Sequence, residues 1–185
     1  GIAAHNDLLY VADGEYGRIH VFDLNGNFIK TIRERGTGDG QLQFSTALAM
    51  DKNKGWLYVS DDDNDRVMKF GSDGSYLDQW GCDSSGDTGL RYPTKIAVDN
   101  NNGVMYVVDS GNQRIIKMSL KLVPLASWGG YGNGDVDGKF RFPVDAAVDK
   151  NGNIYVVDNV NRNIQKFDPN GAFEAKWAIN FDPLI

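Results

Sequence analysis

Histidine and cysteine are scarce in this chain of 185 residues, which has only His5, His20 and Cys82. A single cysteine allows no internal disulfide, and Cys82 has no basic neighbour that would make its thiol reactive. Zinc sites in proteins are built from several histidines or cysteines that converge. The composition therefore gives no support for a disulfide scaffold or for a zinc centre within this chain.

Long apolar runs and an excess of basic residues are also lacking. The chain is 41% hydrophobic without a stretch long enough to span a bilayer, and its net charge is −6 with a pI near 4.8. Nucleic acids and anionic membranes attract basic surfaces, so both are disfavoured as partners. No targeting signal is visible, and the compartment is left open, with an extracellular or cell-surface location favoured over a cytoplasmic one.

One sequence pattern recurs four times along the chain. Its tyrosines Tyr10, Tyr58, Tyr106 and Tyr155 are spaced 48, 48 and 49 residues apart, and each lies in an apolar run that ends in aspartate. A period of about 40 to 50 residues with several short strands is typical of a propeller blade. The pattern predicts blades at approximately 1–44, 45–92, 93–142 and 143–178, followed by a tail at 179–185.

Each repeat is expected to form four antiparallel strands, A to D. In the third repeat these are 93–99, 104–109, 114–118 and 123–128. Asn-Gly or Asp-Gly dipeptides stand at the C to D turn of the other repeats, because these residues tolerate the positive φ angles of tight hairpins. Residues 119–123 contain neither glycine nor asparagine, so a different and longer turn is expected there. Gly1 falls within an expected strand A, so we expect the natural chain to begin earlier.

The repeat resembles the NHL repeat, and the stretch Gly111-Asn112-Gln113-Arg114-Ile115 is the best match. The resemblance covers the four repeats and implies an all-β fold, a β-propeller of NHL type with four recognisable four-stranded antiparallel blades. Because NHL propellers usually have six blades, these four are expected to be part of a six-bladed ring. Similar propellers include a zinc-dependent lyase and calcium-dependent lactonases with catalytic groups in the central channel, and others that bind RNA on a basic rim.

One rim of such a propeller carries the B to C and D to A loops, which are longer and more varied than the turns on the other rim. Loops of this kind usually hold the binding residues. Here they carry an excess of acids, and two tyrosines in them could provide contact area. The candidate binding residues on this rim are Glu15, Tyr16, Asp61, Asp62, Asp63, Asp65, Asp83 and Tyr131.

Two further groups of residues are candidates for chemistry. Lys95 and Asp145 stand at the third position of the expected channel strand and could form a channel-side pair. The alternate acids Asp61, Asp63 and Asp65 resemble the opening of a calcium loop, but Arg66 occupies the position of the usual glycine. We therefore expect no cofactor, with calcium on these three acids as a secondary possibility.

An arginine follows the strand-ending aspartate by five residues in three repeats. In the fourth repeat Arg162 comes one position early, and Asn163 takes the fifth place. An aspartate at the end of strand B can face an arginine that opens strand C, so we expect structural ion pairs for Asp13–Arg18, Asp61–Arg66 and Asp109–Arg114. In the fourth blade we expect the contact to be absent or replaced by an amide hydrogen bond.

Taken together, the sequence favours a non-enzymatic scaffold. Its acidic loop rim is expected to bind a protein, peptide or carbohydrate partner that is neutral or cationic, and not nucleic acid. The alternative is a channel-centred, metal-dependent hydrolase or lyase with ligands in further blades. A third possibility, an RNA-binding propeller, is opposed by the acidic charge.

Overall fold

The computed structural model describes residues 1–32, 34–81 and 89–179 of the chain. These residues form sixteen strands, arranged as four antiparallel sheets of four strands each. Two short 3₁₀ helices, Asp62–Asn64 and Ser110–Asn112, lie in loops. Within the described ranges, no helix has the length and apolar character needed to cross a membrane. The all-β propeller fold expected from the sequence is confirmed.

Each sheet is a meander of consecutive strands, and each is one blade. The strands of blade 1 are β1 (Ile2–His5), β2 (Leu8–Asp13), β3 (Arg18–Asp23) and β4 (Phe28–Ile32). Those of blade 2 are β5 (Ser45–Asp51), β6 (Trp56–Asp61), β7 (Arg66–Phe70) and β8 (Tyr76–Trp80). Those of blade 3 are β9 (Pro93–Asp99), β10 (Val104–Asp109), β11 (Arg114–Ser119) and β12 (Pro124–Gly129). Those of blade 4 are β13 (Pro143–Val148), β14 (Ile154–Asp158), β15 (Asn163–Phe167) and β16 (Phe173–Ala178).

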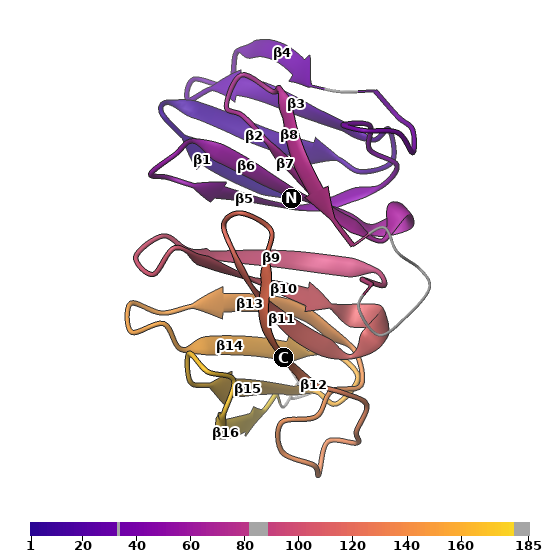
Figure 1. Cartoon of the computed structure of the whole chain (residues 1–185), viewed down its shortest axis with the longest axis vertical. Coiled ribbons are helices and arrows are strands. Elements are labelled where there is room, and N and C mark those ends of the chain that lie inside the picture. Colours follow the sequence, from indigo (N-terminus) through magenta and orange to yellow (C-terminus); the bar gives the residue numbers. More distant parts are fainter. Residues whose placement is uncertain (33, 82–88, 180–185) are drawn as a thin grey trace, which may run out of the picture.

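The blades follow one another along the long axis of the molecule, with blade 1 at the top and blade 4 at the bottom of Figure 1. The inner strands β1, β5, β9 and β13 contact one another in that order. Buried apolar side chains form three clusters, which lie between blades 1 and 2, 2 and 3, and 3 and 4. The middle strands of blades 2 and 3 are largely apolar on both sides because each of these blades lies between two others.

The repeated tyrosine locks each blade to the next one. Tyr10 donates a hydrogen bond to the carbonyl of Ser72 (3.2 Å), and Tyr58 donates one to the carbonyl of Leu120 (2.7 Å). Both acceptors lie beside the C to D turn of the following blade. Tyr106 is buried in the same way between blades 3 and 4. The corresponding residue of blade 4, Tyr155, is only half-buried and contacts Asp149 of its own blade.

The outer faces of the first and last blades are not covered by another blade in the described part of the chain. On blade 1 this face presents Ile2 and Phe28, which are 65% and 59% exposed. On blade 4 it presents Tyr155 and Trp177, whose rings stack with centroids 6.3 Å apart. The arrangement is an open arc of four blades, in agreement with the expectation that these blades are part of a larger ring.

The C to D turn of blade 3 is neither different nor longer, so the sequence-based expectation for 119–123 is wrong. The backbone N–H of Leu122 donates to Ser119, and that of Ser119 donates to Val123. Asp23, Gly26 and Asn27 make the same pair of bonds in blade 1. Leu122 takes the left-handed conformation (φ 59°) that glycine has elsewhere, and its buried side chain joins the cluster between blades 2 and 3. Burial of the side chain offsets the strain of this conformation.

Candidate binding rim

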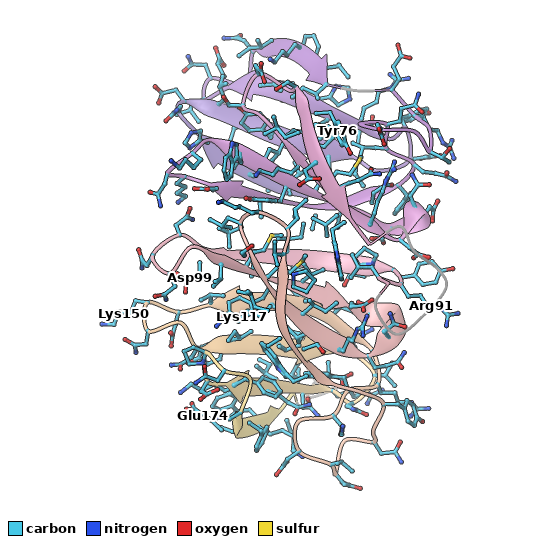
Figure 2. The ribbon with its side chains drawn as sticks, viewed as in Figure 1. Tyr76, Arg91, Asp99, Lys117, Lys150 and Glu174 are labelled. Carbon is cyan, nitrogen blue, oxygen red and sulfur yellow. The ribbon has the colours of Figure 1, made fainter. Side chains whose placement is uncertain are left out.

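The loops of the molecule lie on two opposite rims. We define the loop rim as the B to C and D to A connections, residues 14–17, 34–44, 62–65, 89–92, 110–113, 130–142 and 159–162 of the described chain. The turn rim consists of the A to B and C to D turns. In Figure 2 Arg91, on the loop rim, lies at the right, and Asp99 and Lys150, at the turn rim, lie at the left.

A buried aspartate organises the loop rim in blade 2. Asp61 is 0% exposed, and its Oδ1 accepts hydrogen bonds from the backbone N–H groups of Gln43 (2.9 Å) and Phe44 (3.1 Å). Its Oδ2 accepts from Arg66 Nε (3.1 Å) and from Asn64 Nδ2 (2.7 Å). The carboxylate is thus fully engaged in joining the B to C loop to the D to A loop.

Arg66 extends this network into the preceding loop. Its guanidinium donates to the carbonyls of Thr37 (3.1 Å), Gly38 (3.1 Å) and Gln41 (2.7 Å), and the side chain is 3% exposed. A buried arginine that satisfies several carbonyls and one carboxylate fixes the shape of the loop that connects blades 1 and 2.

Blade 3 repeats the arrangement. Asp109 accepts from Arg114 Nε (2.6 Å), from Asn112 Nδ2 (2.9 Å) and from the backbone N–H of Arg91 (2.7 Å). The asparagine three residues after the aspartate belongs to the stretch that resembles the NHL repeat, but its role in the loops was not predicted from the sequence. It recurs as Asn64, Asn112 and Asn161, and each also donates to a carbonyl of the preceding loop. Its spacing from the aspartate was the available signal.

Blades 1 and 4 depart from this pattern. The expected Asp13–Arg18 ion pair is wrong: in the described chain Asp13 pairs with His20 (3.2 Å), and Arg18 lies over the ring of Tyr16 at 5.4 Å. In blade 4 the described chain shows no Asp158–Arg162 pair, because Arg162 occupies the left-handed position of the loop (φ 51°). The absence of this pair agrees with the expectation for this blade. Asp158 keeps the amide hydrogen bond from Asn161 (2.8 Å), which blades 2 and 3 also have, so this bond is no replacement for the arginine contact.

The acidic candidates do not form one exposed cluster. Asp61 is buried, and Asp65 Oδ1 accepts a hydrogen bond from the backbone N–H of Tyr92 (2.8 Å). Asp62 is half-buried, and Asp63 is exposed. Within the described residues, no three His, Cys, Asp or Glu side chains are grouped so that they could hold a metal ion. Asp61 and Asp65 therefore hold the loops in place, and the run 61–65 is not an exposed acidic cluster.

The remaining candidates are spread over the loop rim. Glu15 and Tyr16 are exposed in blade 1, and Tyr131 is exposed in the loop that leads into blade 4. Asp83 lies outside the described residues. The exposed charges of the described loop rim nearly balance, with one acid in excess. The acids are Glu15, Glu34, Asp39, Asp63, Asp135 and Asp137, and the bases are Arg35, Arg91, Lys139, Arg141 and Arg162.

Three exposed aromatic residues occupy one repeated position on this rim. Phe44, Tyr92 and Phe142 each stand directly before the first residue of an inner strand, and they are 40%, 51% and 40% exposed. Their backbones are held by the aspartates: Asp61 binds the N–H of Phe44, Asp65 that of Tyr92 and Asp158 that of Phe142 (3.0 Å). These aromatic residues were not singled out from the sequence, although their spacing of 48 and 50 residues was visible.

The channel candidates lie together at the inner strands. Lys95 Nζ and Asp145 Oδ1 are 3.0 Å apart, and both side chains are partly exposed. They line a cavity of about 310 Å³ with residues of all four inner strands, among them Ala47 and Thr94. An exposed ion pair of this kind contributes little stability, and by itself it indicates no chemistry.

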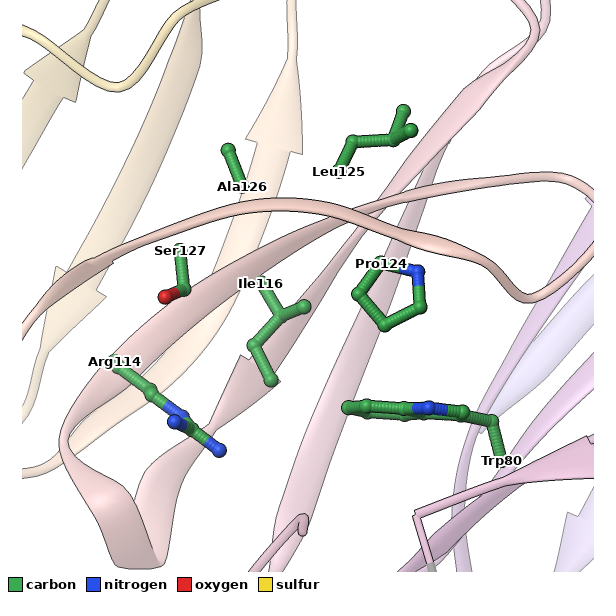
Figure 3. Close-up of a pocket in the computed structure, with 7 residues that line it drawn as sticks. All are labelled: Trp80, Arg114, Ile116, Pro124, Leu125, Ala126 and Ser127. Atoms are coloured by element: carbon green, nitrogen blue, oxygen red, sulfur yellow. The ribbon is translucent and has the colours of Figure 1, made fainter. Parts of the chain in front are cut away.

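A second cavity of about 300 Å³ lies between blades 2 and 3. Figure 3 shows Pro124 and Ser127 of β12 pointing into it, toward Trp80 and Arg114, whereas Leu125 points away. The guanidinium of Arg114 is already engaged by Asp109 and by the carbonyl of Gly89 (2.6 Å). Arg114 is the one charged residue among the described residues that line this cavity, and it is already engaged. The loop rim is therefore the stronger candidate for a binding site.

Comparison with family models gave two matches. A model described as a 6-bladed beta-propeller matches residues 1–87, and one described as NHL repeat matches residues 90–118 and 140–167. A search of curated proteins found no match.

Among solved structures the chain is similar to a catalytically inactive variant of virginiamycin B lyase from Staphylococcus aureus with quinupristin. The TM-score is 0.73 at 12% identity, over 97% of this chain and 55% of that one. It is also similar to hydrazine synthase from Kuenenia stuttgartiensis (TM-score 0.72, 13% identity, 95% and 47% coverage). A third similar structure belongs to a nidogen/laminin complex (TM-score 0.70, 18% identity, 93% and 59% coverage). At these identities the likeness shows the propeller fold, and the chain spans about half of each matched chain.

Proposed function

Because the chain belongs to the NHL-repeat β-propeller family, we propose that it is a non-enzymatic scaffold whose loop rim binds a protein or peptide partner. The observation that carries this proposal is the repeated exposure of Phe44, Tyr92 and Phe142 in consecutive blades. Exposed large apolar residues at scattered positions need no explanation, but their recurrence at one structural position does.

The aromatic residues have the properties of interface hot spots. Large aromatic side chains contribute much of the binding energy in protein interfaces, and they do so best when they are held rigidly before the partner arrives. The strand-end aspartates Asp61 and Asp158 and the loop residue Asp65 supply this rigidity by fixing the backbone beside each ring. Each of the three residues directly precedes an inner strand, so their backbones lie at the loop-rim ends of β5, β9 and β13.

The comparisons are compatible with more than one function. One similar structure is a lyase, and another belongs to a protein complex. The enzymatic alternative rests on this likeness in fold alone, because function belongs to sites and not to folds. The rim proposal rests on residues of this chain.

The proposal can be tested by affinity capture from a native lysate or secretome with three proteins. The first is the wild type, and the second carries Phe44→Ser, Tyr92→Ser and Phe142→Ser. The third is a control with Leu24→Ser, Val123→Ser and Leu125→Ser, which removes three exposed apolar side chains away from the loop rim.

We expect partners of the wild type to be retained by the control and lost by the rim variant. Retention of the same partners by the rim variant would contradict the proposal. Circular dichroism of the three proteins checks that the substitutions leave the fold intact.

A further inference from the structure

Blades 3 and 4 present the same dipeptide type at the same place on the loop rim. Arg91 precedes Tyr92, and Arg141 precedes Phe142, and all four side chains are exposed. Blade 2 has Gln43 before Phe44 at this position. The cationic version of the motif is therefore confined to one sector of the rim.

Hydrogen bonds between the two blades hold these dipeptides close to each other. The buried Ser110 Oγ donates to the carbonyl of Pro143 (2.5 Å), directly after Phe142. Thr94 Oγ1, two residues after Tyr92, lies 2.6 Å from Ser110 Oγ and donates to the carbonyl of Val144 (3.2 Å). The starts of β9 and β13 are thus joined, so one extended ligand can reach both dipeptides.

The guanidinium groups of Arg91 and Arg141 are uncommitted. In the described chain only backbone groups of these arginines are engaged: their N–H groups donate to Asp109 (2.7 Å) and to Asp158 (2.8 Å), and the carbonyl of Arg91 accepts from the N–H of Gly111 (2.8 Å). The stem of Arg91 rests on Gly111, where an added Cβ would come within 2.6 Å of Arg91 Cγ. Gly111 thus leaves the space that the arginine stem occupies beside Tyr92.

The exposed charges of this sector are mostly basic, which favours an anionic ligand. Lys139 and Arg162 add two exposed cations to Arg91 and Arg141. Of the nearby acids, Asp135 is exposed, Asp137 is paired with Lys176 (2.8 Å), and the half-buried Asp65 accepts the backbone N–H of Tyr92 (2.8 Å). Arginine binds carboxylates through two parallel hydrogen bonds, and together with an exposed aromatic ring it makes a typical interface hot spot.

We propose that the Arg91-Tyr92 and Arg141-Phe142 dipeptides form a subsite for an acidic peptide segment, in which aspartate or glutamate side chains alternate with apolar ones. The inference rests on the proposed function and specifies the partner of the same rim. It differs from the sequence-based expectation of a neutral or cationic partner, because Asp61 and Asp65 serve the loop structure. Nucleic acid is the less suitable anion, since the whole chain carries a net charge of −6.

The test uses a displayed library of random peptides, selected on the wild-type chain, with a single-stranded RNA oligonucleotide as a second probe. Selected peptides are then measured by fluorescence anisotropy against two variants. One carries Arg91→Gln and Arg141→Gln. The control carries Lys52→Gln and Lys150→Gln, which removes the same charge from exposed positions on the turn rim.

We expect the selected peptides to be rich in aspartate or glutamate next to apolar residues. Their affinity should fall about tenfold or more in the arginine variant and stay within about twofold in the control, since each charge-assisted hydrogen bond is strong. Replacing the acids of a selected peptide by glutamine should produce the same loss on the wild type.

Other outcomes separate this subsite from the broader proposal. Selected peptides without an acidic bias, or peptides that bind the arginine variant as well as the wild type, would overturn the acidic subsite and leave the binding rim standing. Retention of RNA but of no peptide would overturn both.

Discussion

At the scale of single residues, the aspartate that ends the second strand of a blade fixes the preceding loop in both blade 2 and blade 4, but its neighbours differ. In blade 2 Asp61 has a buried cation, Arg66, beside it. In blade 4 Asp158 is equally buried, but the residue across the ladder is Asn163. Asp158 accepts only from N–H groups, those of Arg141, Phe142 and Asn161.

This difference predicts unequal effects of the same substitution. Asp61→Asn leaves a buried arginine without its counter-ion and should lower the free energy of unfolding by about 3 to 5 kcal/mol. Asp158→Asn removes hydrogen-bond acceptors but strands no cation, so about 1 to 3 kcal/mol is expected. Urea denaturation of the two variants measures the difference, and an equal or larger loss in Asp158→Asn would contradict the account.

The turn rim predicts an acid sensitivity of the fold. Hydrogen bonds from Asn27, Ser75 and Ala172 hold the pKa values of Asp23, Asp73 and Asp168 below the ordinary value of 3.8. A pKa that is lowered in the folded state gives stability that is present above pH 3.8 and is lost as the pH falls through the folded value. The melting temperature should therefore drop below about pH 4.

The triple variant Asp23→Asn, Asp73→Asn and Asp168→Asn should have a flatter melting profile between pH 5 and pH 2 than the wild type, since asparagine does not titrate and can still accept the turn hydrogen bonds. Thermal unfolding followed by circular dichroism is the measurement. A profile parallel to that of the wild type would show that other carboxylates are responsible.

Single residues were also where sequence reasoning was least reliable. The run 61–65 suggested an exposed acidic patch, but which acid of a run turns inward depends on its three-dimensional partners, here Arg66 and the loop at 43–44. Leu122 at a positive φ was not predictable from turn propensities, because burial in a tertiary cluster overrides them. The exposed Tyr92 was missed because an aromatic residue beside an apolar strand is more often buried.

At the scale of strands and blades, prediction from sequence was much better. The third repeat was expected at 93–99, 104–109, 114–118 and 123–128, and its strands lie at Pro93–Asp99, Val104–Asp109, Arg114–Ser119 and Pro124–Gly129. Strand positions follow from local sequence patterns, and a pattern that recurs in four copies can be recognised even where one copy departs from it. The contacts between blades could not be read from such patterns, since they join residues far apart in the sequence, 33 positions for Ser110 and Pro143 and 62 for Tyr58 and Leu120.

The blade contacts predict a contrast between two equivalent tyrosines. Tyr58→Phe removes the hydrogen bond to the Leu120 carbonyl in the next blade and should lower the free energy of unfolding by about 1 kcal/mol. Tyr155→Phe should change it by less than about 0.5 kcal/mol, because its hydroxyl contacts only Asp149 of the same blade at 3.3 Å. Denaturation curves test this, and equal effects would mean that the hydroxyl does not join the blades.

At the scale of the whole molecule, the open arc exposes two apolar sheet faces. Exposed apolar patches favour association, so the chain should show an apparent mass that rises with concentration. Phe28→Lys combined with Trp177→Lys should suppress this rise, whereas Leu125→Lys should not, because β12 belongs to blade 3, which has a neighbouring blade on each side. Sedimentation equilibrium is the measurement, and a wild type that stays monomeric over the whole concentration range would contradict the prediction.

The separation between the buried loop anchors and the exposed rim residues has a consequence for evolution. Asp61, Asn64 and Arg66 fix the loops through buried hydrogen bonds, whereas the side chains of Phe44 and Arg91 are exposed and make no hydrogen bond that fixes a loop in the described chain. Mutations at the projecting positions can accumulate with little effect on folding, and mutations at the anchors cannot. Descendants of such a chain can therefore exchange one partner for another through a few substitutions, while the blades that carry them stay unchanged.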